Sequence, residues 1–247
     1  MPAVTKALFR EDAYLKIMTA RVVSITPTGG IVLDRTVFYA TSGGQPGDTG
    51  HLRRNDGTQI QITGTVTGEN KDDIVHLPAD GEAVLSVGDE VVGEIDWDRR
   101  HKLMRMHTAC HLLTVICPFP ITGASVSEDD SRVDFDIPDA SFTKEDVSAR
   151  MMELIREDHP IFTRWITDEE LIANPTLVKS KNVRPPVGSG RIRLVGIGEE
   201  GKIDTQPCGG THVRSTAEVG DIHIGKIEKK GRENRRFRIR FGIAPAS

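Results

Sequence analysis

The chain has 247 residues, of which 37 % are hydrophobic and 28 % are charged, with a formal net charge of −4. A chain of this size and composition forms one or two soluble domains. No apolar run approaches the length of a membrane span, and the first nine residues lack the long apolar core of a secretory signal. Three cysteines make no disulfide framework, so we expect a cytoplasmic protein without membrane attachment.

Charge is distributed unevenly along the chain. Residues 1–98 carry 8 Lys and Arg against 15 Asp and Glu, whereas residues 99–247 carry 24 against 21. This asymmetry indicates a polyanionic partner for the second part of the chain.

Residues 14–98 have the pattern of short strands separated by Gly-rich turns. The predicted strands, rich in Val, Ile and Thr, are Ala20–Ile25, Gly30–Asp34, Gln59–Val66, Asp73–His76 and Val91–Asp96. Regular short strands of this kind favour a small β-barrel, and a sandwich is the alternative.

Residues 36–50 form an unusual loop within this first part. Gly43 and Gly44 can bring the backbone close to another surface, together with the amide side chain of Gln45. A tight hairpin turn explains the same residues, and the sequence leaves both interpretations open.

Two His residues lie four apart in a segment that has the pattern of a helix. Residues 99–117 contain neither Gly nor Pro, and apolar side chains recur near helical spacing until Pro118. Residues four apart share one helix face, so His107 and His111 can direct their imidazoles at one atom. A lone pair of this kind is more often part of a core or a surface than of a metal site.

A second pair with the same spacing, Cys208 and His212, occurs far downstream. Gly209 and Gly210 lie between them and Pro207 precedes them, so this pair is expected on a loop. Three imidazoles and one thiolate are a normal ligand set for zinc. The two pairs together predict one zinc site, with the ligands His107, His111, Cys208 and His212.

The region between the two pairs mixes strand and helix patterns. Ser131–Ile137 alternates polar and apolar residues and predicts a strand. Thr143 is a candidate N-cap for a helix that extends to about Glu157, and Thr167–Glu170 has the capping-box pattern of a second, short helix. With the strands of the first part, this predicts an α+β protein.

Residues 226–241 are strongly basic, with 8 Lys and Arg against 2 Glu. In Arg236–Phe241 basic and apolar residues alternate strictly, so a strand would place its arginines on one face. We interpret this face as a surface that binds RNA phosphates, and a solvated outer sheet face is the alternative. The candidate RNA-binding residues are Lys229, Lys230, Arg232, Arg235, Arg236, Arg238 and Arg240.

The segments His107–Leu113 and Cys208–Val213 together resemble the editing domain of alanyl-tRNA synthetase. They resemble still more closely the free-standing AlaX-type alanyl-tRNA editing proteins. Gly43, Gly44 and Gln45 resemble the Gly-Gly-Gln loop of the longer AlaX proteins, although Ala40 stands where that family usually has Pro. The resemblance extends over nearly the whole chain and indicates the medium-length type.

This resemblance implies a small β-barrel like that of translation elongation factors at residues 1–98, and an α+β zinc-containing editing domain at residues 99–247. Asp96–Arg100 is expected to be the hinge between them. The resemblance also implies that the Gly-Gly-Gln loop approaches the zinc site and that the strand at 131–137 lines the editing pocket. Candidate pocket residues are Gly44, Gln45, Ser125 and Gly209.

The implied activity is hydrolysis of the ester that links a wrong amino acid, chiefly serine, to tRNA(Ala), with one Zn²⁺ per chain. The expected partner is tRNA(Ala) mischarged with serine or glycine, and the sequence does not identify protein partners. A non-catalytic, zinc-stabilised RNA-binding module is the alternative, because four protein ligands also suit a closed structural site. A zinc peptidase is disfavoured, since Thr108 stands where the peptidase motif has Glu.

Overall fold

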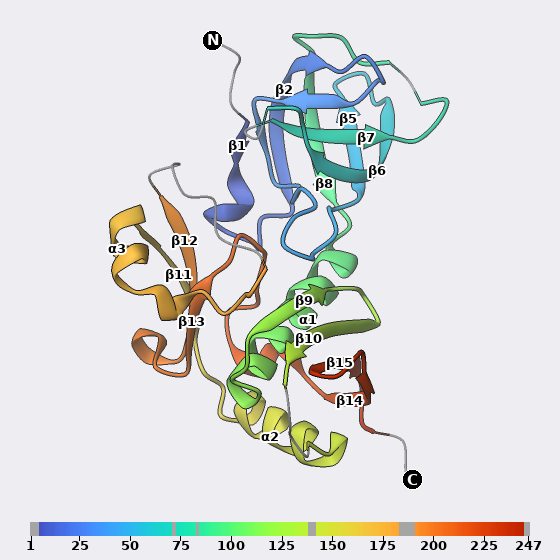
Figure 1. Cartoon of the computed structure of the whole chain (residues 1–247). Helices are drawn as coiled ribbons and strands as arrows, with labels where there is room; N and C mark the ends of the chain where they lie inside the picture. The colour runs from blue at the N-terminus through green and yellow to red at the C-terminus, as the bar shows by residue number, and fades with distance from the viewer. Residues whose placement is uncertain (1–4, 71–72, 83, 138–141, 183–190, 245–247) are drawn as a thin grey trace. The chain divides into compact units, whose positions relative to one another are not determined.

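The computed structural model describes residues 5–70, 73–82, 84–137, 142–182 and 191–244. The chain divides into two compact units, Met1–Lys102 and Leu103–Ser247, and helix α1 (Trp97–Ile116) contains the boundary (Figure 1). The expected hinge is therefore helical from Trp97 onward, because the carboxylate of Asp96 accepts a hydrogen bond from the backbone N–H of Arg99 at 3.1 Å. Within the described residues, no helix has both the length and the apolar character to span a membrane.

Six strands of the first unit form a closed barrel, which confirms the barrel over the sandwich. Their order is β2 (Ile17–Ile25), β3 (Ile31–Leu33), β7 (Ile74–Pro78), β6 (Gln59–Thr67), β5 (Gly50–Arg54) and β8 (Glu90–Ile95), and β8 pairs with β2. Alternate residues of these strands point inward and form one apolar core, which includes Leu33, Leu52 and Ile60. β1 (Lys6–Ala7), η1 (Leu8–Arg10) and β4 (Arg35–Thr36) complete the unit, and β1 and β4 pair in parallel.

His76, on β7, is buried in this unit. Its Nε2 lies 2.8 Å from Oγ1 of Thr36, and its Nδ1 lies 2.9 Å from the carbonyl oxygen of Ile31. Burial lowers the pKa of His76 from 6.5 to about 4, although the Ile31 carbonyl acts in the opposite direction. The imidazole is therefore neutral in the folded protein at neutral pH.

Acidification is expected to destabilise the protein through His76. The unfolded chain binds a proton below pH 6.5, whereas the folded chain does not until about pH 4, so stability falls as the pH falls through this range. The expected loss from this residue is about 3 kcal/mol at the acid end. Urea unfolding at several pH values measures it, and His76→Gln should remove this part of the pH dependence; an unchanged profile would contradict the assignment.

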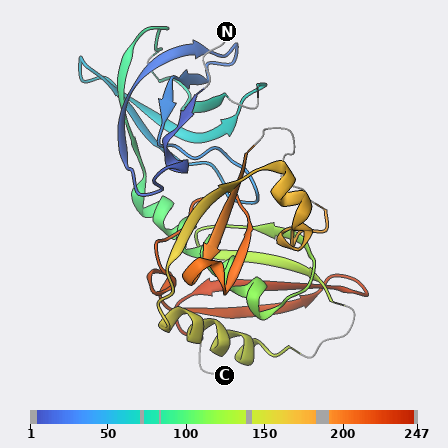
Figure 2. The same ribbon diagram turned by 90° about the vertical axis from the view of Figure 1, so that its left-hand side faces the viewer.

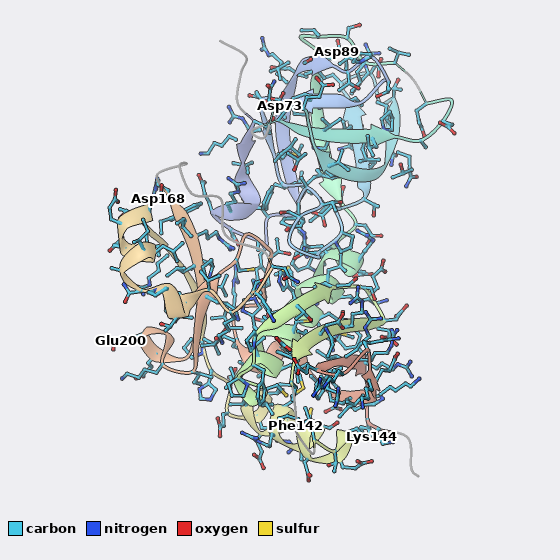
Figure 3. The ribbon with its side chains drawn as sticks, viewed as in Figure 1. Asp73, Asp89, Phe142, Lys144, Asp168 and Glu200 are labelled. Atoms are coloured by element: carbon cyan, nitrogen blue, oxygen red, sulfur yellow. The ribbon has the colours of Figure 1, made fainter. Side chains whose placement is uncertain are left out.

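The second unit contains a four-stranded antiparallel sheet. Its order is β14 (Ile222–Lys229), β15 (Asn234–Phe241), β10 (Asp130–Asp136) and β9 (Ile121–Ser125). Helix α2 (Lys144–Arg156) lies along β14, where Oγ of Ser148 accepts a hydrogen bond from the N–H of Ile224 at 2.8 Å (Figures 1 and 2). As predicted, Thr143 caps this helix. Phe142, labelled in Figure 3, packs edge-on against Phe237 with ring centroids 5.8 Å apart.

A three-stranded antiparallel sheet, with the order β11 (Ile161–Ile166), β12 (Ile192–Ile197) and β13 (Asp204–Pro207), completes the framework. The second unit also contains the short helical segments α3 (Asp168–Ala173), η2 (Pro175–Leu177), η3 (Glu199–Gly201) and η4 (Thr216–Val219). Leu171 of α3 packs against Ile166, Ile192 and Leu194, so one face of this sheet is covered by apolar contacts. The predicted capping box of α3 is present at Thr167 and Glu170.

Helix α1 passes through the interior of the second unit. Leu103, Met104, Met106, Leu112 and Leu113 have no exposed surface. A helix that is apolar on nearly all sides is stable only when it is buried, and α1 follows this rule from Leu103 onward. His107 and His111 therefore lie in the interior, 6 % and 5 % exposed.

Candidate metal centre

The structure brings the four predicted ligands together. The ring centroids of His107 and His111, one turn apart on α1, are separated by 5.3 Å, and the ring of His212 lies 4.3 and 4.5 Å from them. Sγ of Cys208 lies 3.5 Å from Nε2 of His107 and 3.3 Å from Nε2 of His212. The four ligand atoms all lie within 4.8 Å of one another, so this cluster can hold one metal ion.

Cys208 and His212 lie on the loop that follows β13, as predicted. Arg193 of β12 fixes this loop, because its Nη1 donates hydrogen bonds to the carbonyl oxygens of Cys208 and Gly210, each at 2.9 Å. The N–H of Gly210 in turn points at Sγ of Cys208, at 3.4 Å. A Cβ added at Gly209 would contact nothing within 4 Å, so the missing side chain leaves open space beside Cys208.

The electrostatics of the cluster favour a thiolate at Cys208 and a neutral imidazole at His212. Burial alone would raise the pKa of Cys208, but His107 and His212 outweigh it and hold this pKa well below its usual value of 9.0. Burial, together with His107, lowers the pKa of His212 to about 3. Deprotonated sulfur and unprotonated nitrogen are the forms that bind a metal ion, so the donor set fits a soft or borderline divalent cation.

A polar network lies behind His111. Its Nδ1 is 3.4 Å from Oδ2 of Asp204, and the same oxygen accepts a hydrogen bond from Nε2 of Gln206 at 2.7 Å. Lys179 forms an ion pair with Asp204 and donates a hydrogen bond to Oγ1 of Thr114 at 3.2 Å. Burial alone would lower the pKa of His111, but Asp204 and Cys208 raise it to about 9.

Because the carboxylate of Asp204 lies beside Nδ1 of His111, the other ring nitrogen, Nε2, is available to bind a metal ion in the cluster. On the opposite side, Oγ1 of Thr108 lies 3.1 Å from Nδ1 of His212, whose Nε2 faces Cys208. Partners of this kind fix the tautomer and the orientation of a metal-binding imidazole. Asp204, Lys179, Gln206 and Thr108 were not among the predicted site residues, since nothing in their local sequence distinguishes them.

The chain is similar to known alanyl-tRNA editing proteins over nearly its whole length. The chain is 38 % identical to the alanyl-tRNA editing protein AlaX-M of Methanosarcina acetivorans, over 95 % of this chain and 98 % of the relative. It is 34 % identical to AlaX-M of Saccharolobus solfataricus, over 98 % of this chain and 100 % of that protein. The chain belongs to the AlaX-M family of alanyl-tRNA editing proteins.

Larger proteins share the same region. Alanine–tRNA ligase of Pyrobaculum aerophilum is 37 % identical over 91 % of this chain, which corresponds to 25 % of the ligase. Residues 10–99 match the family of class II (A) tRNA synthetases, and residues 192–238 match the second additional domain of threonyl- and alanyl-tRNA synthetases. The second match contains Cys208 and His212, whereas His107 and His111 lie between the two matched segments.

The Gly-Gly-Gln loop of this AlaX-M chain is a tight hairpin turn. Ser42 and Gln45 exchange backbone hydrogen bonds at 2.9 and 3.1 Å around Gly43 and Gly44, whose φ angles are +56° and +86°. Two successive residues with positive φ define a type I′ turn, which explains both glycines. The side chain of Gln45 is buried, and the expected approach of this loop to the metal ligands stays a prediction.

Two further predicted groups lie on the four-stranded sheet. Ser125 is half-buried at the end of β9, opposite Arg132 of β10, and its role in a pocket stays a prediction. The strand prediction for the basic tail is confirmed by β15, which buries Phe237 and Ile239 and turns the arginines to the other face. Arg236, Arg238 and Arg240 are thus on one face, but their surroundings are less open than expected.

Carboxylates engage the three alternating arginines of β15. Arg236 binds both oxygens of Asp134, at 2.8 and 2.9 Å. Arg238 donates to Glu228 at 2.6 Å and to Asp130 at 3.0 Å, and Arg240 donates to Asp130 at 2.9 Å. RNA phosphates would have to compete with these carboxylates. The exposed Lys229, the last residue of β14, and Arg232, in the connection to β15, are easier points of contact.

Asp204→Asn tests the network behind His111. Loss of the carboxylate charge should lower metal affinity by about 10–100-fold, because a residue that orients a metal ligand typically contributes this much to the affinity. Competition with a chromophoric chelator measures the affinity directly. Asp136→Asn is the matched control, since Asp136 pairs at the surface with Lys181 at 2.5 Å; equal affinities of the two variants would exclude this role of Asp204.

Proposed function

We propose that this AlaX-M protein is a zinc-dependent hydrolase that removes a wrong amino acid, chiefly serine, from tRNA(Ala). The observation that carries the proposal is the convergence of His107, His111, Cys208 and His212 in a chain that belongs to this family. We further propose one Zn²⁺ per chain, with residues 99–247 as the editing domain. Residues 1–98 would form an elongation-factor-like barrel whose Gly43–Gln45 loop serves the bound RNA end.

The four clustered side chains would hold the zinc ion, and Asp204 and Thr108 would orient two of the imidazoles. When bound, zinc supplies a Lewis acid that polarises the ester or orients the amino or hydroxyl group of the aminoacyl moiety. Arg193 keeps the Cys208–Gly210 backbone in place through its two hydrogen bonds. A catalytic zinc ion usually has three protein ligands and one open position, so with four protein ligands the coordination would have to expand before a substrate group or a water molecule could bind.

Selection of serine over alanine follows from the polar character of the site. A site built to bind a hydroxyl group leaves its own polar groups unpaired when alanine occupies it, and such a mismatch commonly excludes the analogue by about 10⁴-fold. The correctly charged tRNA would therefore survive. Glycine, which also lacks the hydroxyl group, should be removed more slowly than serine.

Exposed basic residues at the end of β14 and in its connection to β15 are proposed to bind the RNA backbone. Neutralising Lys229 and Arg232 together, with Gln at both positions, should weaken tRNA binding and lower the salt slope by about 2, one for each phosphate contact. Arg236→Gln is the matched control, because Asp134 already engages that guanidinium. Filter-binding titrations at several salt concentrations give the slopes; if the control lowers the slope as much, the contact surface is the β15 face.

The experiment that tests the function compares zinc-loaded and metal-stripped protein on serine-charged tRNA(Ala). Release of serine by the loaded form, its loss on stripping and its return on reloading would establish a zinc-dependent deacylase. If the loaded protein binds the tRNA but does not release serine, the non-catalytic zinc-stabilised RNA-binding module replaces this proposal.

A further inference from the structure

An exposed tryptophan lies at the edge of the sheet that carries the metal-binding loop. Trp165 belongs to β11, the edge strand of the three-stranded sheet, and is 41 % exposed. Its neighbour on the chain, Ile166, is buried on the opposite face against Leu171. Exposing the large apolar surface of an indole ring to water is unfavourable. An exposed tryptophan beside the candidate metal centre therefore suggests a ligand that covers the ring.

Strand register places Trp165 on the same sheet face as Arg193, which holds the loop of Cys208. Trp165 pairs directly with Arg193, and directly paired residues of antiparallel strands project to one face. On the other side of Arg193, its carbonyl oxygen accepts a hydrogen bond from the N–H of Cys208 at 3.1 Å. Trp165 and Arg193 therefore lie in one row across the sheet, the backbone of Cys208 continues this row in the loop that follows β13, and Figure 2 shows the three strands side by side.

The spacing of this row suits a single nucleoside. Two strand separations place the backbone of Trp165 about 10 Å from that of Cys208. The guanidinium of Arg191 lies over the indole ring, 5.1 Å from its centroid, so one face of the aromatic ring carries a positive charge. An aromatic plane with an adjacent guanidinium combines stacking for a base with attraction for its phosphate.

We propose that Trp165 and Arg191 form the binding site for the 3′-terminal base of the acylated RNA. The ester of that nucleotide then lies one nucleoside away, at the Cys208 end of the row. This inference rests on the proposed function and adds to it the residue that positions the RNA end. One aromatic side chain is enough to stack a single unpaired base. This contact would add to the proposed contacts of basic residues with the RNA backbone.

Steady-state deacylation tests the proposal first. Trp165→Leu should raise KM for serine-charged tRNA(Ala) about tenfold and leave kcat within about twofold, since base–aromatic stacking typically contributes this much to binding. Trp165→Phe keeps an aromatic plane and should restore most of the affinity. A KM for the Leu variant that matches the wild type would overturn the proposal, and so would an equal loss in the Leu and Phe variants.

A binding measurement separates this inference from the proposed function, because it needs no hydrolysis. The chain has two tryptophans, so the variant Trp97→Phe reports the fluorescence of Trp165 alone. An uncharged acceptor-stem RNA with its complete CCA end should quench this fluorescence, whereas the same RNA without the terminal adenosine should not. Quenching without any deacylation would retain this site and reject the enzyme, whereas deacylation without terminal-base-dependent quenching would reject this site alone.

Discussion

Cys208→Ala is expected to lose both its metal ion and its deacylase activity. Cys208 is the anionic donor of the four, because His107 and His212 lower the pKa of its thiol against the effect of burial and so favour the thiolate. Residues that only hydrogen-bond to metal ligands typically change metal affinity by about 10–100-fold. Loss of a direct ligand should therefore lower metal affinity by more than about 100-fold. Metal content after dialysis and the rate of serine release measure the two effects.

A second cysteine provides the matched control for this variant. Cys117, directly after α1, is fully buried, and burial raises the pKa of its thiol to about 12, so it stays protonated. Cys117→Ala should keep its metal ion and its activity, with only a modest loss of stability from the removed sulfur. If Cys208→Ala retains metal and activity as Cys117→Ala does, Cys208 is not a ligand.

Arg100→Met is expected to destabilise the first unit by about 3–5 kcal/mol, the cost of breaking a buried ion pair. Arg100 and Asp48 are 0 % and 1 % exposed, and Nε of Arg100 donates to both carboxylate oxygens, at 3.0 and 2.9 Å. Arg100 also donates to the carbonyl oxygens of Ala13 and Val37, at 2.9 and 2.7 Å. Methionine would leave two carbonyls and a carboxylate buried without these donors.

Urea unfolding of the full chain measures this effect, with Arg99→Met as its control. Arg99, the preceding residue, donates from Nη1 to the carbonyl oxygen of Gly47 at 2.8 Å but is partly exposed. Its replacement should cost about 1 kcal/mol, the usual contribution of one hydrogen bond. The double variant Arg100→Met with Asp48→Asn should recover part of the loss, because no charge then stays buried; equal costs for the two single arginine variants would contradict the role of the pair.

Local sequence patterns predicted the elements that present the metal ligands. The expected helix at 99–117 corresponds to α1, and the expected loop carries Cys208 and His212. Caps at Thr143 and Thr167 were also correct. These features depend on residues within a few positions of one another, so the sequence displays them directly. β5 was missed because Leu52 is its only buried residue, within Gly50–Arg54.

Pairing between distant residues explains what the sequence could not reveal. Arg100 appeared to be part of a charged linker, yet it is buried against Asp48, 52 positions away. Arg236 was expected to face RNA, yet it binds Asp134, 102 positions away. Asp204 acquires its place behind His111 only when β13 and α1 pack together. A local pattern shows that a residue is charged, whereas the fold decides which partner its charge meets.

The most direct test of the account is deacylation of tRNA(Ala) charged with serine, beside the same tRNA charged with alanine. Zinc-loaded protein should release serine rapidly and leave alanine attached, with a ratio of rates of about 10⁴, as expected for a site that requires a hydroxyl group. Equal rates for the two esters would contradict selection by the hydroxyl group. Cleavage of neither ester would contradict the assignment of this metal centre to the editing of tRNA(Ala).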